Sequence, residues 1–114
     1  MLANLDFLKS FTKGDVEKLN KYISIFIDTV QQKDIEIKKA LEDKKKEVIK
    51  IHVHTLKSQC RYMGLNNLEP LILQIEEACG LEDSSLDAIA EQLSTLLANL
   101  NQAILELGEV IQKK

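Results

Sequence analysis

The sequence lacks the features that mark several classes of protein. Its two cysteines, Cys60 and Cys79, form no C-x-x-C pair and have no metal-ligand spacing around them, so we expect buried, reduced thiols rather than a metal site. The net charge is only −3 and no arginine-rich arm is present, which argues against nucleic-acid binding. The most apolar stretch, residues 22–30, is too short to cross a membrane. These absences predict a soluble, cytoplasmic protein without direct membrane contact.

Tryptophan is absent, proline occurs once, at Pro70, and aromatic residues make up only 4% of the chain. What remains is rich in leucine, isoleucine, glutamate and lysine, a composition that favours helices packed through aliphatic side chains. Hydrophobic residues make up 45% and charged residues 29%, which is typical of a folded chain rather than a disordered one. A length of 114 residues suits one core, so we predict a single domain over residues 1–114.

Apolar residues recur at three- and four-residue spacing along most of the chain, which predicts helices. The clearest helix is expected over residues 45–63. Its buried stripe consists of Ile49, Val53, Leu56, Cys60 and Met63.

Four further helices complete the predicted architecture. They are expected over residues 2–11, over 15–41 with a bend near 31–34, from an asparagine cap at 66 or 67 to 79, and from 84 or 85 onward. The charged run 42–46 is expected as a solvated turn or helix start. Short turns between long helices imply an all-α fold: an up-down-up-down antiparallel four-helix bundle with a short extra N-terminal helix.

His54 lies in the middle of the third predicted helix, about 140° around from the buried stripe, so its imidazole should point to solvent. Neutral imidazole is a nucleophile near neutral pH, and nearby cations would offset the charge of an attached phosphoryl group. The polar residues that share this face are Glu47, Lys50, Lys57, Ser58 and Arg61.

His52 faces nearly the opposite way, at the edge of the apolar stripe, which favours a packing or hydrogen-bonding role. Residues two apart on a helix cannot chelate one ion, and the sequence has no third histidine. No metal site is therefore predicted.

The segment His54-Thr55-Leu56-Lys57-Ser58 is followed by Gly64, ten residues after the histidine, and then by Leu65 and Leu68. This pattern resembles the signature of histidine-containing phosphotransfer (HPt) domains, which is His-x-Leu-Lys-Gly/Ser, then a turn of helix, a glycine and an amphipathic helix. The order of the predicted helices is similar as well, so the resemblance extends over nearly the whole chain.

The resemblance implies a phosphorelay intermediate of two-component signal transduction. In that role His54 accepts a phosphoryl group from a receiver-domain aspartate and passes it to another receiver domain. Lys57 would steady the phosphoryl group, and Ser58 would fill the family's small-residue position. The residues expected to contact the partner are Lys50, Arg61, Gly64, Gln74 and Glu76.

The expected partners are receiver domains of response regulators or of a hybrid sensor kinase. The chain would be a monomeric phosphocarrier rather than an enzyme, either free or as the soluble module of a membrane-bound hybrid kinase. It would carry no cofactor, because the sequence has no glycine-rich nucleotide loop and no P-loop lysine motif. The resemblance implies that Mg²⁺ is held by the receiver domain.

The sequence departs from the family pattern after Ser58, where bulky Gln59, Arg61 and Tyr62 replace small residues. On the fourth predicted helix, where relatives often place a glutamine near the histidine, the chain offers Gln74 and Glu76. A glutamate there would orient the imidazole but oppose the phosphate, and its role stays open. Two alternatives also stay open: a helical adaptor that is never phosphorylated, and a degenerate phosphotransfer scaffold.

Overall fold

The structure is a computed structural model that describes residues 2–112, and every regular element in that range is helical. A short helix, α1 (Asp6–Phe11), precedes the long α2 (Val16–Glu42). The chain continues through α3 (Lys46–Tyr62), a single 3₁₀ turn η1 (Asn66–Leu68), α4 (Glu69–Cys79) and α5 (Leu86–Gln112). The all-α prediction is confirmed.

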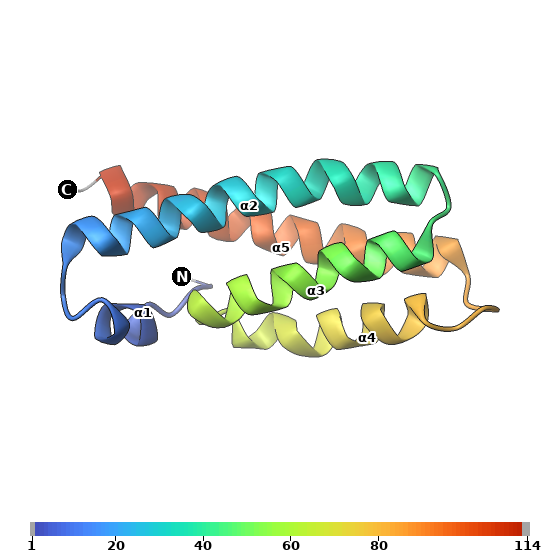
Figure 1. The fold of residues 1–114 in the computed structure, drawn as a ribbon, viewed down its shortest axis with the longest axis horizontal. Helices are drawn as coiled ribbons and strands as arrows, with labels where there is room; N and C mark the ends of the chain where they lie inside the picture. Colours follow the sequence, from blue (N-terminus) through green and yellow to red (C-terminus); the bar gives the residue numbers. More distant parts are fainter. Residues whose placement is uncertain (1, 113–114) are drawn as a thin grey trace.

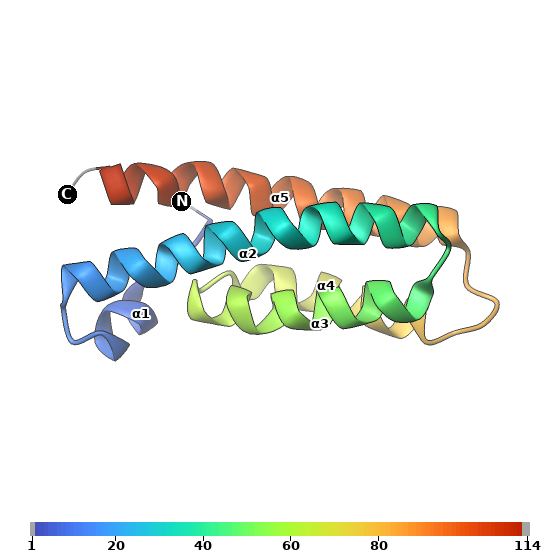
Figure 2. The same cartoon turned by 45° about the horizontal axis from the view of Figure 1, so that its top comes forward.

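The long helices lie side by side in a rod with a longest dimension of 47 Å. In Figure 1 the chain runs along α2, returns along α3, runs forward along α4 and returns along α5, so consecutive long helices alternate in direction. Figure 2 shows α5 lying along α2, with α3 and α4 together on the other side. This arrangement places α3 between α2 and α4, and those two helices make most of its contacts with other helices.

The core of the bundle is almost entirely aliphatic, because one stripe of each long helix turns inward. Phe26 is the only aromatic residue among the buried core side chains of the described chain. The stripe predicted for α3 is buried from Ile49 to Met63. Cys60 and Cys79 are buried free thiols, as expected.

Two helix starts differ from the sequence prediction. The first helix begins at Asp6 rather than at residue 2, because residues 2–5 form an irregular segment that buries Ala3 and Leu5. The fourth helix is not capped by an asparagine side chain: η1 occupies residues 66–68, and Leu68 stands at the N-cap of α4 without a side-chain hydrogen bond. The long α2 runs unbroken through residues 31–34, the region of the expected bend.

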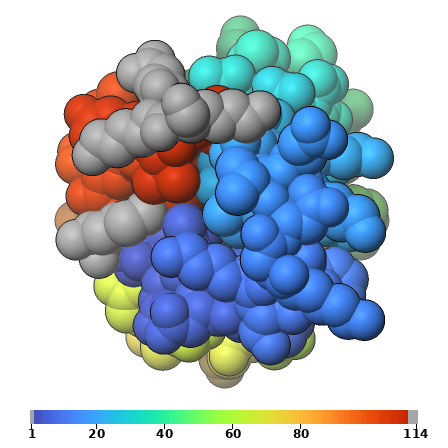
Figure 3. All heavy atoms as spheres, turned by 90° about the vertical axis from the view of Figure 1, so that its left-hand side faces the viewer, coloured from blue at the N-terminus to red at the C-terminus, as the bar shows by residue number. Residues whose placement is uncertain are grey.

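The irregular N-terminal segment is fixed to the turn after α3. The backbone N–H of Asn4 donates to the carbonyl oxygen of Met63 at 3.0 Å. Gly64 follows with a φ of +67°, and its missing side chain leaves room for the backbone of Asn4. Figure 3 looks at this end of the molecule, where α1, in dark blue, lies below the start of α2. The segment thereby holds α1 beside the C-terminal end of α3.

The charged run 42–46 forms the turn between α2 and α3, with Lys44 in the left-handed region at a φ of +59°. Lys46 is not merely solvated, because its ammonium donates to the carbonyl oxygens of Leu81, Glu82 and Ser84, at 3.1, 3.2 and 2.6 Å. The first residue of α3 therefore anchors the loop between α4 and α5.

Candidate functional site

The exposed face of α3 carries the candidate site. The side chain of His54 is 64% exposed, whereas Val53 and Leu56 on either side of it are fully buried. The helical period explains the contrast, because neighbouring residues lie about 100° apart around the helix. The expectation that His54 points to solvent is confirmed.

His54 forms a three-residue cluster with Lys57, one turn further along α3, and with Glu76 of α4. The Nδ1 atom of His54 lies 3.3 Å from Oε2 of Glu76. The other carboxylate oxygen, Oε1, lies 3.1 Å from Nζ of Lys57. The side chains of Lys57 and Glu76 are only 15% and 14% exposed. The exposed imidazole therefore contacts an ion pair that is itself mostly buried.

The groups around Glu76 determine whether its carboxyl group is ionised. Partial burial raises the pKa of its carboxyl group, but the ion pair with Lys57 and the hydrogen bond from His54 lower it, and the net pKa is below the usual value. Glu76 is therefore a carboxylate at neutral pH. A carboxylate can only accept hydrogen bonds, so Nδ1 of His54 must be the nitrogen that carries the proton. The Nε2 atom, on the other side of the ring, is left as the basic nitrogen.

The other predicted site residues are spread along α3 and α4. Ser58 is exposed one turn after His54. Arg61 is also exposed, but its guanidinium is paired with Glu69 at 2.6 Å and does not act as a free charge beside the imidazole. Gln74 is exposed on α4, and of the two candidates there it is Glu76 that reaches His54.

Two residues have positions that the sequence did not suggest. Lys50 extends toward the end of α4, where its Nζ lies 3.7 Å from the place that a Cβ on Gly80 would occupy. Gly64 belongs to the turn that holds the N-terminal segment. The structure therefore explains the glycine at this position without any contact to a partner.

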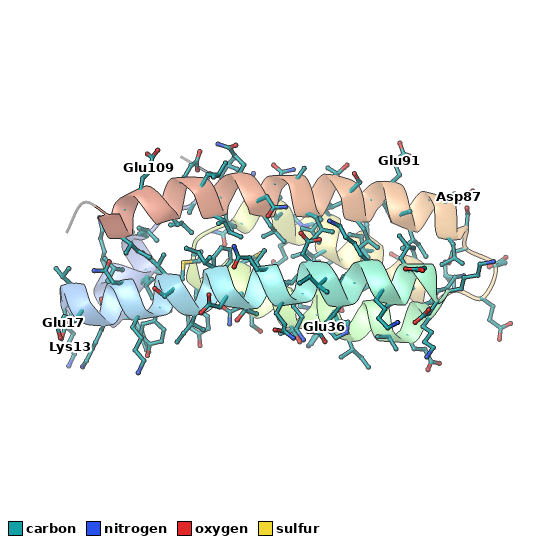
Figure 4. All side chains as sticks on the ribbon, turned by 90° about the horizontal axis from the view of Figure 1, so that it is seen from above. Lys13, Glu17, Glu36, Asp87, Glu91 and Glu109 are labelled. Carbon is teal, nitrogen blue, oxygen red and sulfur yellow. The ribbon has the colours of Figure 1, made fainter. Side chains whose placement is uncertain are left out.

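His52 lies on the opposite flank of α3, against α2, and its side chain is 13% exposed. Its Nδ1 is 3.1 Å from Nζ of Lys33 and its Nε2 is 3.5 Å from Oε2 of Glu36. Figure 4 shows Glu36 on the side of α2 next to α3. These contacts agree with the hydrogen-bonding role expected for His52.

An exposed aromatic cluster at the C-terminal end of α3 was missed from the sequence. Phe7 and Phe11 of α1 stack with their centroids 6.1 Å apart, and Tyr62 at the end of α3 lies 6.0 Å from Phe7. Tyr22 of α2 completes the cluster, 5.6 Å from Phe11. The spacing of Phe7 and Phe11 by four residues is the signal that could have revealed it.

The aromatic cluster borders a shallow groove whose lining includes Ser58, one turn after His54. The residues that line it are Phe7, Ser58, Arg61, Tyr62 and Asn66. Phe7, Phe11 and Tyr62 are 55%, 52% and 42% exposed, so most of the aromatic residues of this chain lie on its surface rather than in its core. An exposed apolar patch of this kind is typical of a contact site for another protein.

The two cysteine thiols are unsuited to act as nucleophiles. Burial raises the pKa of the Cys60 thiol to about 12 and also raises the pKa of Cys79. Within residues 2–112 no group of three histidine, cysteine or acidic side chains is placed to hold a metal ion. Over the same range, no helix combines the length and the apolar character that crossing a membrane requires.

The chain matches the model of a known family. A family model described as "Hpt domain" matches residues 21–107, a range that runs from α2 to near the end of α5 and includes the cluster of His54, Lys57 and Glu76. The comparison with curated proteins gave no match. No solved structure matched either.

Proposed function

The chain belongs to the Hpt domain family, and from this premise we propose that it is a phosphorelay intermediate that carries its phosphoryl group on His54. Domains of this family act in histidine phosphotransfer. The proposal adds the acceptor residue, the nitrogen that reacts and the surface that meets the partner.

The observation that carries the proposal is the state of the His54 ring. Its side chain is 64% exposed, and its Nδ1 atom faces the carboxylate of Glu76. A nucleophilic imidazole needs one nitrogen with a free lone pair and an open approach. With the proton held on Nδ1, the Nε2 atom meets both requirements.

Transfer proceeds by in-line displacement at phosphorus. The lone pair of Nε2 forms a bond to the phosphorus of a receiver aspartyl phosphate, the P–O bond breaks, and the receiver carboxylate takes the electron pair. The reverse displacement, by the carboxylate of another receiver domain, completes the relay. The receiver domain supplies the aspartate and the Mg²⁺ ion, and this chain supplies the nucleophile.

Lys57 and Ser58 support the acceptor in different ways. Lys57 is a cation linked to the ring through Glu76, so it offsets part of the negative charge that the phosphoryl group adds. Ser58 is small and exposed on the same face as His54, which leaves space for the receiver domain's active site to approach.

The docking surface combines the outer face of α3 with the aromatic cluster. Ile51 is 64% exposed one turn before His54, and Tyr62 and Phe7 lie beyond Ser58 in the other direction. Apolar side chains on both sides of a polar reacting group match the anatomy of a specific protein interface. Arg61 lines the groove between them and would make a polar contact at its edge.

The test is phosphoryl transfer from a phosphorylated receiver domain to the purified chain. We expect an acid-labile, base-stable phosphoryl group, as for a P–N bond, that is lost in His54→Gln. The matched control is His52→Gln, which removes a histidine from the same helix and should keep most of the label. A labelled His54→Gln protein would move the acceptor elsewhere. An unlabelled wild type that still binds the receiver would support the adaptor or the degenerate scaffold.

A further inference from the structure

Glu76 occupies a position where it affects His54 without facing a partner directly. It is 14% exposed and lies below the ring, in contact with Nδ1 through one oxygen and with Lys57 through the other. A neutral acceptor such as a glutamine oxygen would be enough to orient the ring. The negative charge must therefore have a further consequence.

We propose that Glu76 is a positioning residue that keeps the proton on Nδ1 throughout the transfer cycle and so keeps phosphorylated His54 able to release its phosphoryl group as the pH rises. This inference rests on the proposed function, since it concerns the phosphorylated form of the same histidine.

The chemistry of release makes the proton necessary. When Nε2 gains the phosphoryl group and Nδ1 keeps its proton, the ring carries a positive charge. When a receiver carboxylate attacks phosphorus, the electron pair of the N–P bond returns to Nε2, and the ring leaves as neutral imidazole. Without the Nδ1 proton the same step would expel an imidazolate anion, which is a far poorer leaving group. The phosphorylated ring therefore donates only while Nδ1 is protonated.

The carboxylate of Glu76 favours that protonated form. An opposite charge within 4–6 Å stabilises a charged group, and Oε2 lies 3.3 Å from Nδ1. Because the ion pair with Lys57 and the hydrogen bond from His54 keep the pKa of Glu76 low despite its burial, the carboxylate stays charged over the whole range in which an imidazole titrates.

Lys57 pairs with the other oxygen of Glu76, and Glu47 is exposed two turns before His54; the remaining charges near the ring are engaged elsewhere. On α3, Arg61 pairs with Glu69, and Lys50 extends toward the end of α4. On the opposite flank, the charged groups of α2 that face α3 contact His52 rather than His54. The 3₁₀ turn η1 has no charged residue. Among the described residues, Glu76 is therefore the ionised side chain paired with the ring.

The experiment measures how fast the phosphorylated chain loses its phosphoryl group at different pH values. The intact protein is labelled with phosphoramidate, a small phosphodonor that needs no receiver domain, and the donor is removed. Phosphohistidine is then followed by ³¹P NMR from about pH 5 to about pH 9, across the titration range of an imidazole. The ¹⁵N shift of Nδ1 reports the proton directly.

In Glu76→Gln, which keeps the shape of the side chain, we expect the pH at which loss slows and the Nδ1 titration to move down together by roughly one pH unit. Above that midpoint the variant should keep its phosphoryl group several-fold to about tenfold longer than the wild type. The matched control is Glu77→Gln, which removes an exposed acidic charge from the next position of α4 and should follow the wild-type curve.

Superimposed curves for the wild type and Glu76→Gln, or a shift toward higher pH, would overturn the role of Glu76. A failure of this inference can be distinguished from a failure of the proposed function. If phosphoramidate and phosphorylated receivers label no histidine in any variant, the acceptor assignment is wrong. If His54 is labelled but its release does not depend on Glu76, only this inference is wrong.

Discussion

Replacing Gly64 by alanine tests the contact between the N-terminal segment and the bundle. Gly64 has a φ of +67°, where an alanine costs about 1–2 kcal/mol. An added Cβ would also overlap the carbonyl oxygen of Asn4 and would lie 2.8 Å from its carbonyl carbon. Because these are backbone atoms, the N-terminal segment itself must move.

The movement has a cost that the structure allows us to estimate. The hydrogen bond from Asn4 to Met63 would be weakened or lost, at about 1 kcal/mol, and part of the burial of Ala3 and Leu5 would go with it. Together with the backbone cost, Gly64→Ala should lower the free energy of unfolding by about 2–4 kcal/mol.

Gly14→Ala is the matched control. Gly14 has a similar φ of +77°, but nothing lies within 4 Å of the place where its Cβ would be. It therefore incurs only the backbone cost of about 1–2 kcal/mol. Urea denaturation of the two variants and the wild type, followed by far-UV circular dichroism, measures the difference. Equal losses in the two variants would refute the tight contact between Gly64 and Asn4.

Three further predictions concern charged side chains. Lys57→Ala should slow transfer or shorten the phosphohistidine lifetime by a few-fold to about tenfold, because Glu76 loses its ion pair. If the variant transfers at the wild-type rate with every receiver tried, the lysine has no such role. Folding lowers the pKa of Glu76, so the contribution of this carboxylate to stability is full above about pH 4.5 and is lost as the pH falls through its pKa in the folded state. In acid denaturation, Glu76→Gln should therefore lose less stability than the wild type. Lys46→Met should speed hydrogen exchange in the loop at 81–84 and lower stability by about 1–2 kcal/mol, and unchanged exchange would refute the anchoring role.

Features set by local spacing could be predicted from the sequence. The buried stripe of α3 and the exposure of His54 follow from the helical period alone, because both depend on one helix. The helix starts at residues 6 and 69 could not be predicted in this way. The apolar residues of the segment before α1 are buried in an irregular segment that is bonded to the α3–α4 turn, although their spacing also fits a helix.

The contact between Glu76 and His54 depends on the register between two helices. On α4, Glu76 lies about 70° from the centre of the buried stripe, and Gln74 lies about 130° from it. The sequence could therefore have shown that Glu76 is the half-buried one. It could not show which neighbour Glu76 faces, because either flank of the stripe can lie against α3 or α5 until the direction of packing is known.

The two histidines show how the arrangement of helices, rather than residue type, favours His54 as the proposed acceptor. They are two residues apart on α3, so one turns toward α2 and the other toward α4. Lys33 and Glu36 of α2 contact both ring nitrogens of His52, which leaves neither free for phosphorus. Glu76 contacts only Nδ1 of His54, and the exposed ring keeps Nε2 for reaction. Moving the nucleophile to position 52 would therefore require opening the α2–α3 interface, whereas at position 54 it needs only the approach of a partner.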